Sequence, residues 1–180
     1  INTMDSTSNV RGVNFLNASG GTESNDGNFK IHTFTGPGTF TVNSLGSSPS
    51  DNAVDYLIVA GGASGANRSP GNANGGGGAG GFRYSAGTFC ATGPGASRAA
   101  PASVPISVQG YTIVVGAGGG AVPGPDPAGS RGNAGSVSSV LGLTSAGGGG
   151  GGAGGTGGPC VGLPGGSGGG GGGGRGAPFG

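Results

Sequence analysis

The chain has 180 residues, of which 52 are glycine and 7% are charged, with a formal net charge of +1. This composition excludes long α-helices, because the residues that build them are scarce. It also excludes collagen, because glycine comes in unbroken blocks such as 147–152 rather than at every third position. A nearly neutral chain indicates no nucleic-acid partner, and no apolar run reaches the length needed for membrane insertion.

Charge and glycine both divide the chain near residue 60. Residues 1–60 carry two basic and five acidic residues, whereas residues 61–180 carry five basic residues and one acidic residue. Residues 1–60 hold 7 glycines and the remainder holds 45. The first ten residues lack the basic start and apolar run of a signal peptide. Because the chain starts at Ile1 rather than Met, we expect a processed or truncated product.

The first third predicts β-structure. Residues 29–34 and 39–42 are rich in β-branched and aromatic residues, and they flank the turn signal Gly36-Pro37-Gly38. This arrangement predicts a β-hairpin. The apolar run 54–60 predicts a strand that is covered on both faces. Further strands are expected at 111–115 and, on weaker patterns, at 104–108 and 137–143.

Four glycine blocks follow, at 75–81, 116–120, 147–158 and 165–176. Flexible linkers are one interpretation, since glycine chains are random coils. Four linkers within residues 61–180 would join almost nothing, so we favour packed rods. In such rods, polyglycine-II helices with three residues per turn lie side by side, and their backbone amides bond to neighbouring chains. Ordering glycine costs backbone entropy, so the strands 54–60 and 111–115 are expected to form the nucleus.

The sequence indicates no enzyme, cofactor or metal. Residues 116–121 match a G-x-G-x-x-A dinucleotide fingerprint, but the proline-rich run 122–127 follows and cannot open the helix that this fingerprint requires. The single histidine, His32, is predicted to be a half-exposed strand residue. One Glu and five Asp, mostly before residue 60, form no visible carboxylate pair or metal cluster.

Two covalent features stay open. Cys90 and Cys160 fit no zinc spacing, which leaves one disulfide or two thiols, depending on the compartment. Asn17 and Asn67 each begin an N-glycosylation pattern, although chance matches are expected in a chain rich in Asn, Ser and Thr.

The connectors between the glycine blocks hold most of the side chains that could recognise a partner. Charged and aromatic residues there suit anionic sugars or protein surfaces. The alternative is that the arginines solubilise the body and the aromatic residues cover the sheet. The receptor-binding candidates are Arg68, Arg83, Tyr84, Asp126, Arg131 and Arg175.

The order of motifs resembles the glycine-rich domain of bacteriophage tail-fibre adhesins over roughly residues 29–176. The resemblance rests on Gly38 to Val42, Asp55 to Gly62, Gly75 to Arg83, Tyr111 to Gly120 and Ser138 to Gly152. In that family, polyglycine-II rods stack into a sandwich whose distal loops contact a host outer-membrane protein or polysaccharide. The resemblance therefore implies rods that carry recognition loops.

We expect a mainly β or irregular fold with almost no helix, in three parts. Residues 1–28 would be an attachment or donated segment, 29–60 a β-rich base and 61–180 a glycine-rich body. One hypothesis is a non-enzymatic adhesin of a virion tail fibre, with a host surface protein or polysaccharide and other fibre subunits as partners. The alternative is a secreted extracellular fibre whose copies assemble through strand or rod exchange.

Overall fold

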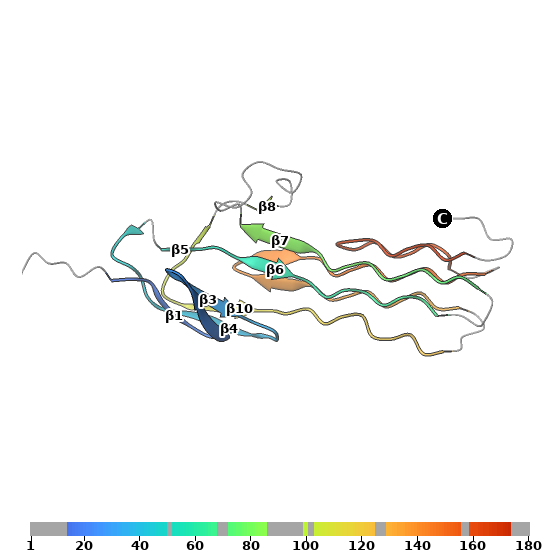
Figure 1. Ribbon diagram of the computed structural model, residues 1–180, viewed down its shortest axis with the longest axis horizontal. Coiled ribbons are helices and arrows are strands. Elements are labelled where there is room, and N and C mark those ends of the chain that lie inside the picture. The colour runs from blue at the N-terminus through green and yellow to red at the C-terminus, as the bar shows by residue number, and fades with distance from the viewer. Residues whose placement is uncertain are drawn as a thin grey trace, which may run out of the picture.

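The computed structural model describes residues 14–49, 52–67, 72–85, 99–100, 103–124, 129–155 and 159–173. These residues form an elongated body, with strands at one end and long extended segments that run to the other end (Figure 1). They are mainly β or irregular with almost no helix, which confirms the expected fold class at this level. None of the described residues belongs to a helix long and apolar enough to cross a membrane.

The base is built around a three-stranded antiparallel sheet in the order β1-β4-β10. Its central strand alternates, so that Phe40 and Val42 are buried while their neighbours are less covered. Two strand pairs, β2-β3 and β5-β9, complete the base. The bounds are β1 Asn17–Ser19, β2 Thr22–Asp26, β3 Phe29–Thr33, β4 Gly38–Ser44, β5 Ala53–Val54, β9 Val104–Pro105 and β10 Gly110–Ile113.

The prediction that residues 29–34 and 39–42 pair with each other as a hairpin is wrong. Strand β3 pairs with β2, whereas β4 pairs with β1 and β10. The reason lies in the corner before β2, where Gly20 and Gly21 have φ of 113° and 66°. The ring of Phe34 fills this corner, 3.1 Å from where a Cβ on Gly21 would be. The segment 36–38 therefore carries the chain from the hairpin to the main sheet.

A second sheet, in the order β6-β7-β8, lies where the base meets the body. The predicted strand 54–60 is split into β5 and β6, and its coverage on both faces is wrong, because Leu57 and Val59 are 62% and 55% exposed. Ile58 alone faces inward, toward the hairpin β11-β12. The bounds are β6 Leu57–Val59, β7 Phe82–Ser85, β8 Ala99–Ala100, β11 Ser138–Val140 and β12 Leu143–Ser145.

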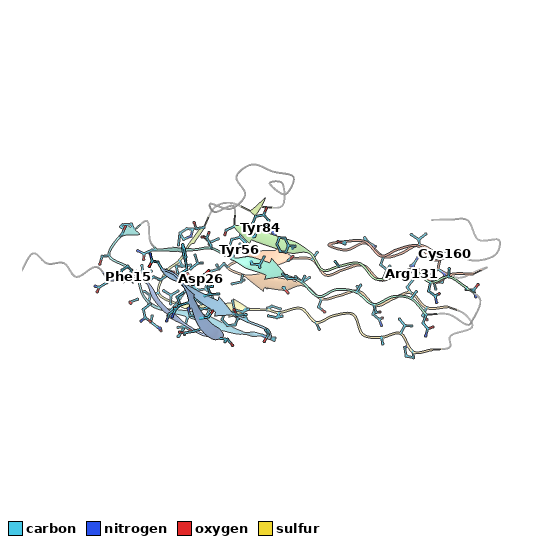
Figure 2. All side chains as sticks on the ribbon, viewed as in Figure 1. Phe15, Asp26, Tyr56, Tyr84, Arg131 and Cys160 are labelled. Carbon is cyan, nitrogen blue, oxygen red and sulfur yellow. The ribbon has the colours of Figure 1, made fainter. Side chains whose placement is uncertain are left out.

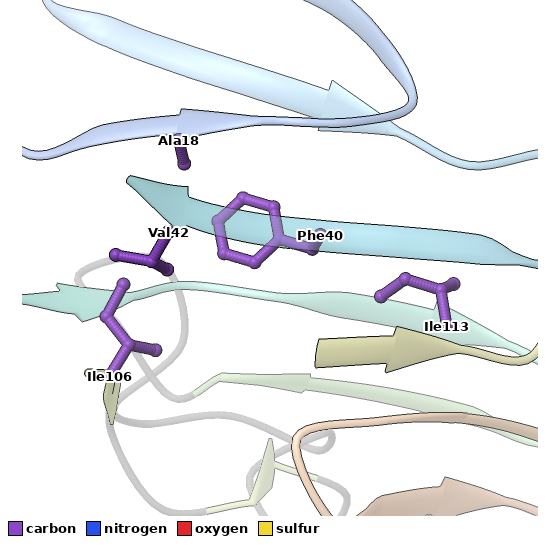
Figure 3. Packing of buried hydrophobic residues seen from close by; sticks show 5 residues of the cluster. All are labelled: Ala18, Phe40, Val42, Ile106 and Ile113. Atoms are coloured by element: carbon purple, nitrogen blue, oxygen red, sulfur yellow. The ribbon is translucent and has the colours of Figure 1, made fainter. Parts of the chain in front are cut away.

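The hydrophobic core lies in the base, between the main sheet and the segments that pack beneath it (Figure 3). Five buried side chains form it, from β1, β4, β10 and the residue after β9. They are Ala18, Phe40, Val42, Ile106 and Ile113. Burying each of the larger ones contributes about 1.5–3 kcal/mol, so side-chain packing holds the base together.

Seven extended segments, which we call rods 1 to 7, form the body (Figure 1). They comprise residues 60–67, 72–81, 115–124, 129–137, 146–155, 159–164 and 166–173, in this order. Rod 1 donates backbone hydrogen bonds to rod 2 at every third residue, and to rod 4 at the residue after each. The donors are Ala60, Ala63 and Ala66 to rod 2, and Gly61, Ser64 and Asn67 to rod 4. A strand would repeat every second residue, so rod 1 is not a β-strand.

Rod 5 lies at the centre of the body, and its residues 148–155 are all buried. The amides of Gly148 and Gly151 donate to rod 1, whereas those of Gly149 and Gly152 donate to rod 7. Its carbonyls accept from rods 2, 4, 6 and 7. Backbone hydrogen bonds also join rods 4 to 1, 1 to 2, 2 to 7 and 7 to 6, so these five rods surround rod 5 in that order.

Steric contact explains why rod 5 is almost pure glycine. A Cβ on any of residues 148–152 would meet the backbone of a neighbouring rod; on Gly151 it would meet the carbonyl oxygen of Gly75. In rod 4 the requirement recurs at every third residue, at Gly132 and Gly135. By contrast, a Cβ on Gly76 would have no heavy atom within 4 Å.

Candidate functional site

The far end of the body gathers the ends of several rods. Asn67 and Ser130 exchange two backbone hydrogen bonds of 3.1 and 3.0 Å, and Ala73 and Gly173 exchange two of 2.9 Å. The segments 68–71, 125–128, 156–158 and 174–180 therefore all follow residues that lie at this end. They include three of the six predicted candidates, Arg68, Asp126 and Arg175, which lie outside the described residues.

Arg131 is the fourth candidate at this end, where Figure 2 labels it beside Cys160. Its Nε donates to the carbonyl oxygen of Val161 at 2.8 Å, which joins rod 4 to rod 6. The five rods around rod 5 form an open ring, in which rod 4 is the first and rod 6 the last. Among the described residues no backbone hydrogen bond joins rods 4 and 6. Arg131 is exposed, so it keeps guanidinium donors available to a partner while its Nε closes the ring.

Asparagine side chains join neighbouring rods, a role that was not predicted from the sequence. The Asn67 side chain donates to the Val122 carbonyl at 3.2 Å, and that of Asn133 donates to the Gly120 carbonyl at 2.8 Å. The Asn74 side chain accepts from the Gly154 amide at 3.3 Å. Asn residues beside glycine blocks were the available signal, because their amides can satisfy exposed backbone groups. A glycan on Asn67 would attach to the same nitrogen that bonds Val122.

A model of the glycine-rich domain family matches residues 33–180. The chain belongs to this family. Neither the comparison with curated proteins nor the comparison with solved structures finds a match. The matched region begins at the end of β3 and includes all seven rods of the glycine-rich domain.

Arg83 and Tyr84 lie elsewhere in the glycine-rich domain, on β7 beside the base. The Arg83 Nη1 donates to the Thr144 carbonyl at 2.8 Å, which ties β7 to β12. The Tyr84 ring centroid lies 5.5 Å from that of Phe82. Figure 2 shows Tyr84 well apart from Arg131 along the long axis. The structure therefore does not bring these two candidates together with those at the far end.

An apolar surface covers the outer face of β6 and β7 in the glycine-rich domain. Leu57 pairs with Tyr84 and Val59 with Phe82, so these four side chains share one face. Leu57, Val59 and Phe82 are all more than 40% exposed. This surface was not predicted, because the apolar run 54–60 indicated a strand covered on both faces.

His32 is more buried than predicted, because 10% of its side chain is exposed rather than about half. Its Nδ1 lies 2.8 Å from the Gly20 carbonyl oxygen, to which it donates, and its ring packs edge-on against Phe40 at 5.1 Å. His32 therefore fixes the hairpin β2-β3 on the main sheet. The described residues contain no group of three His, Cys, Asp or Glu that could hold a metal ion.

The predicted disulfide and the predicted glycosylation at Asn17 stay predictions. Cys160 is half-buried, with its Sγ 3.5 Å from the Gly155 carbonyl oxygen, whereas Cys90 lies outside the described residues. A disulfide between them stays a prediction. Asn17 is exposed on β1, and its side chain accepts a hydrogen bond from Asn43 at 3.0 Å.

Proposed function

We propose that the glycine-rich domain is a non-enzymatic receptor-binding module at the tip of a phage tail fibre. The observation that carries this proposal is the placement of the rod ends. The segments that connect them follow residues at one end of a rigid bundle, opposite the β-rich base. Loops on a rigid scaffold suit recognition, because the scaffold fixes their positions without constraining their sequence.

We infer that the rods are polyglycine-II helices. Hydrogen bonds that recur every third residue fit a helix with three residues per turn, in which side chains and amides point in three directions. Rod 5 uses these directions to bond five neighbours, as expected of a helix inside a lattice. At about 3.1 Å per residue, an eight-residue rod holds its end about 25 Å from the base.

The chemistry of the rod ends fits a polar or anionic partner. Arg131 is exposed there, and the adjoining segments carry Arg68, Asp126 and Arg175. Guanidinium groups bind carboxylates and phosphates through paired donors, as in acidic polysaccharides or the loops of an outer-membrane protein. The proposed partner is therefore a host surface protein or polysaccharide, and the proposed location is the virion tail fibre.

Loop exchange tests this function. Residues 68–71 and 125–128 are replaced, separately and together, by Gly-Ser segments of equal length, and adsorption of the fibre to host cells is measured. We expect adsorption to be lost while thermal unfolding is unchanged. Arg83→Ala is the matched control, because it removes an arginine at the other end. Undiminished adsorption for every exchanged segment would contradict the proposal.

One observation favours a second function, a subunit of a self-assembling extracellular fibre. A Cβ on Gly76 or Gly120 would have no heavy atom within 4 Å, and the nearest to one on Gly168 would be 3.8 Å away. Since this chain's own packing does not require glycine there, these positions suit contact with a rod of another copy. Electron microscopy tests this: open-ended filaments of the purified chain that Gly76→Leu abolishes would support the fibre, and dispersed particles would exclude it.

A further inference from the structure

One side of the molecule, which we call the flat face, is formed by rods 1 and 2 together with β6, which precedes rod 1, and β7, which follows rod 2. The two rods lie side by side and run in opposite directions, joined by hydrogen bonds from Ala60, Ala63 and Ala66 (Figure 1). Rods 4, 5 and 7 bond them from the inner side, and no described rod bonds their outer side. The proposed receptor site at the rod ends does not account for this outer side.

The three-residue repeat determines which residues lie on the flat face. In rod 2, a Cβ on Gly75 would meet rod 7 and a Cβ on Gly77 would meet rod 1, so the remaining set, which includes Gly76, points outward. Ile58 faces the hairpin between rods 4 and 5, so the outer sides of β6 and β7 continue the same face. Eight exposed residues form it: Leu57, Val59, Gly62, Gly65, Ala73, Gly76, Ala79 and Phe82.

Rod 1 also carries unpaired backbone groups. Two of every three amides donate to rods 2 and 4, which leaves Gly62 and Gly65. These two amides have no acceptor in the part of the chain that the structure describes, and the carbonyls of Ala63 and Ala66 have no donor there. Each kind of group recurs at every third residue, which is about 9 Å along a rod that rises about 3.1 Å per residue. Rod 1 therefore offers a regular row of donors and acceptors to a further chain.

The composition of the flat face differs from that of other exposed rod positions. None of its eight residues has a charged or hydrogen-bonding side chain, whereas the exposed positions of rod 4 include Arg131, Asn133 and Ser136. The chain's own packing does not explain this, because a Cβ on Gly76 would have no heavy atom within 4 Å. Small, uncharged residues there instead allow close approach of another backbone, as in the interior of the body.

A second copy of the chain matches the flat face in both its chemistry and its repeat. Leu57, Val59 and Phe82 are 62%, 55% and 46% exposed, and an exposed apolar surface of this kind marks an interaction site. A charged partner would find no counter-charge on this face. A facing copy offers the same row of amides and carbonyls at the same spacing, so each copy supplies the partners that the other lacks.

We propose that two copies pack flat face against flat face, about a two-fold axis perpendicular to the rods. The rods of the two copies then run in opposite directions, so that amides face carbonyls as they do between the antiparallel rods 1 and 2. Gly62 and Gly65 donate to the facing copy, and Leu57, Val59 and Phe82 of each copy lose contact with water beside the small residues of the other. Such a pair is closed, unlike an open-ended fibre, and it rests on neither proposed function.

Sedimentation equilibrium and amide hydrogen exchange of the full chain, each over a series of protein concentrations, test this proposal. We expect the mass to rise from one copy to two, and the amides of Gly62 and Gly65, fast in dilute protein, to slow at least tenfold over the same range. Gly76→Arg should stay a single copy, because two charges would face each other across the pair. Gly168→Arg is the matched control and should pair like the wild type, since the atom nearest its Cβ, at 3.8 Å, belongs to rod 6.

A second variant covers the case in which Gly76→Arg disturbs rod 2, which a melting temperature below that of Gly168→Arg would reveal. Leu57→Lys adds a charge at an exposed position of β6 and should also prevent pairing. A wild type that stays a single copy at every concentration would overturn the proposal. So would pairing that Gly168→Arg abolishes as fully as Gly76→Arg, or growth beyond two copies, which would favour the fibre. Adsorption to host cells tests the receptor function separately.

Discussion

The base and the body of this chain are stabilised by different groups. In the base, five buried side chains form a core between strands, as in ordinary β-proteins. In the body, the central rod buries residues 148–155, whose one side chain beyond hydrogen is the Ala153 methyl group. Its contacts are backbone to backbone, through hydrogen bonds to five neighbours. A buried lattice of amides can therefore replace a hydrophobic core, provided that nothing separates the chains.

The largest expected effect is a single methyl group added to the central rod. In Gly151→Ala the new Cβ would meet the Gly75 carbonyl, so rods 2 and 5 must separate and lose hydrogen bonds. We expect a loss of at least about 4 kcal/mol in the free energy of unfolding, measured by denaturant titration. Gly76→Ala is the matched control and should change it by less than about 0.5 kcal/mol. Equal effects at the two positions would contradict the claim that close backbone contact between rods holds the body together.

The next largest effect is expected in the base. Phe40→Ala leaves a cavity in the core and removes the ring that His32 packs against. We expect a loss of about 3 kcal/mol in the free energy of unfolding. Phe40→Leu is the matched control. It should lose much less stability than Phe40→Ala, because the base depends on buried apolar volume. An alanine variant as stable as the wild type would show that side-chain packing does not hold the base.

A smaller effect is expected where the two regions meet. Arg83→Ala removes the solvent-exposed hydrogen bond from β7 to the Thr144 carbonyl. We expect a loss of about 1 kcal/mol in the free energy of unfolding and no change in adsorption to host cells. Weaker adsorption with unchanged stability would return Arg83 to the binding surface.

The smallest effect concerns the surface ion pair of the hairpin β2-β3. The hydrogen bond from Lys30, at 2.9 Å, lowers the pKa of Glu23 below its usual value. A lowered pKa in the folded state adds stability at pH above the unfolded value, and this stability disappears as pH falls through the folded value. In Lys30→Ala we expect the Glu23 pKa, measured by NMR titration, to rise toward its ordinary value, with little change in melting temperature. An unchanged pKa would show that Lys30 does not cause the shift.

The sequence predicted the body better than the base. Glycine blocks such as 147–158 indicated packed rods, because a missing Cβ is a property of each residue alone. The partner of each strand is set by contacts far apart in the chain, so the hairpin at Gly36 to Gly38 was mispaired with β4. The corner glycines Gly20 and Gly21, and the burial of His32, depend on Phe34 and Phe40, whose positions the local pattern does not encode.

The candidate site was predictable only in part, for the same reason. Arg131 and Arg83 were both predicted as candidates, but Arg131 lies at the rod ends and Arg83 lies beside the base. The end of the body at which each arginine lies depends on the direction of its rod. That direction follows from the order of the rods in the bundle.

Amide hydrogen exchange along rod 1 tests the central claim most directly, that backbone hydrogen bonds with a three-residue repeat hold the body together. Ala60, Gly61, Ala63, Ser64, Ala66 and Asn67 donate to neighbouring rods, whereas the exposed Gly62 and Gly65 have no acceptor among the described residues. We predict two slow amides followed by one fast amide, repeated along the rod. Alternation of slow and fast amides, as in a β-strand, or uniformly fast exchange would contradict the account.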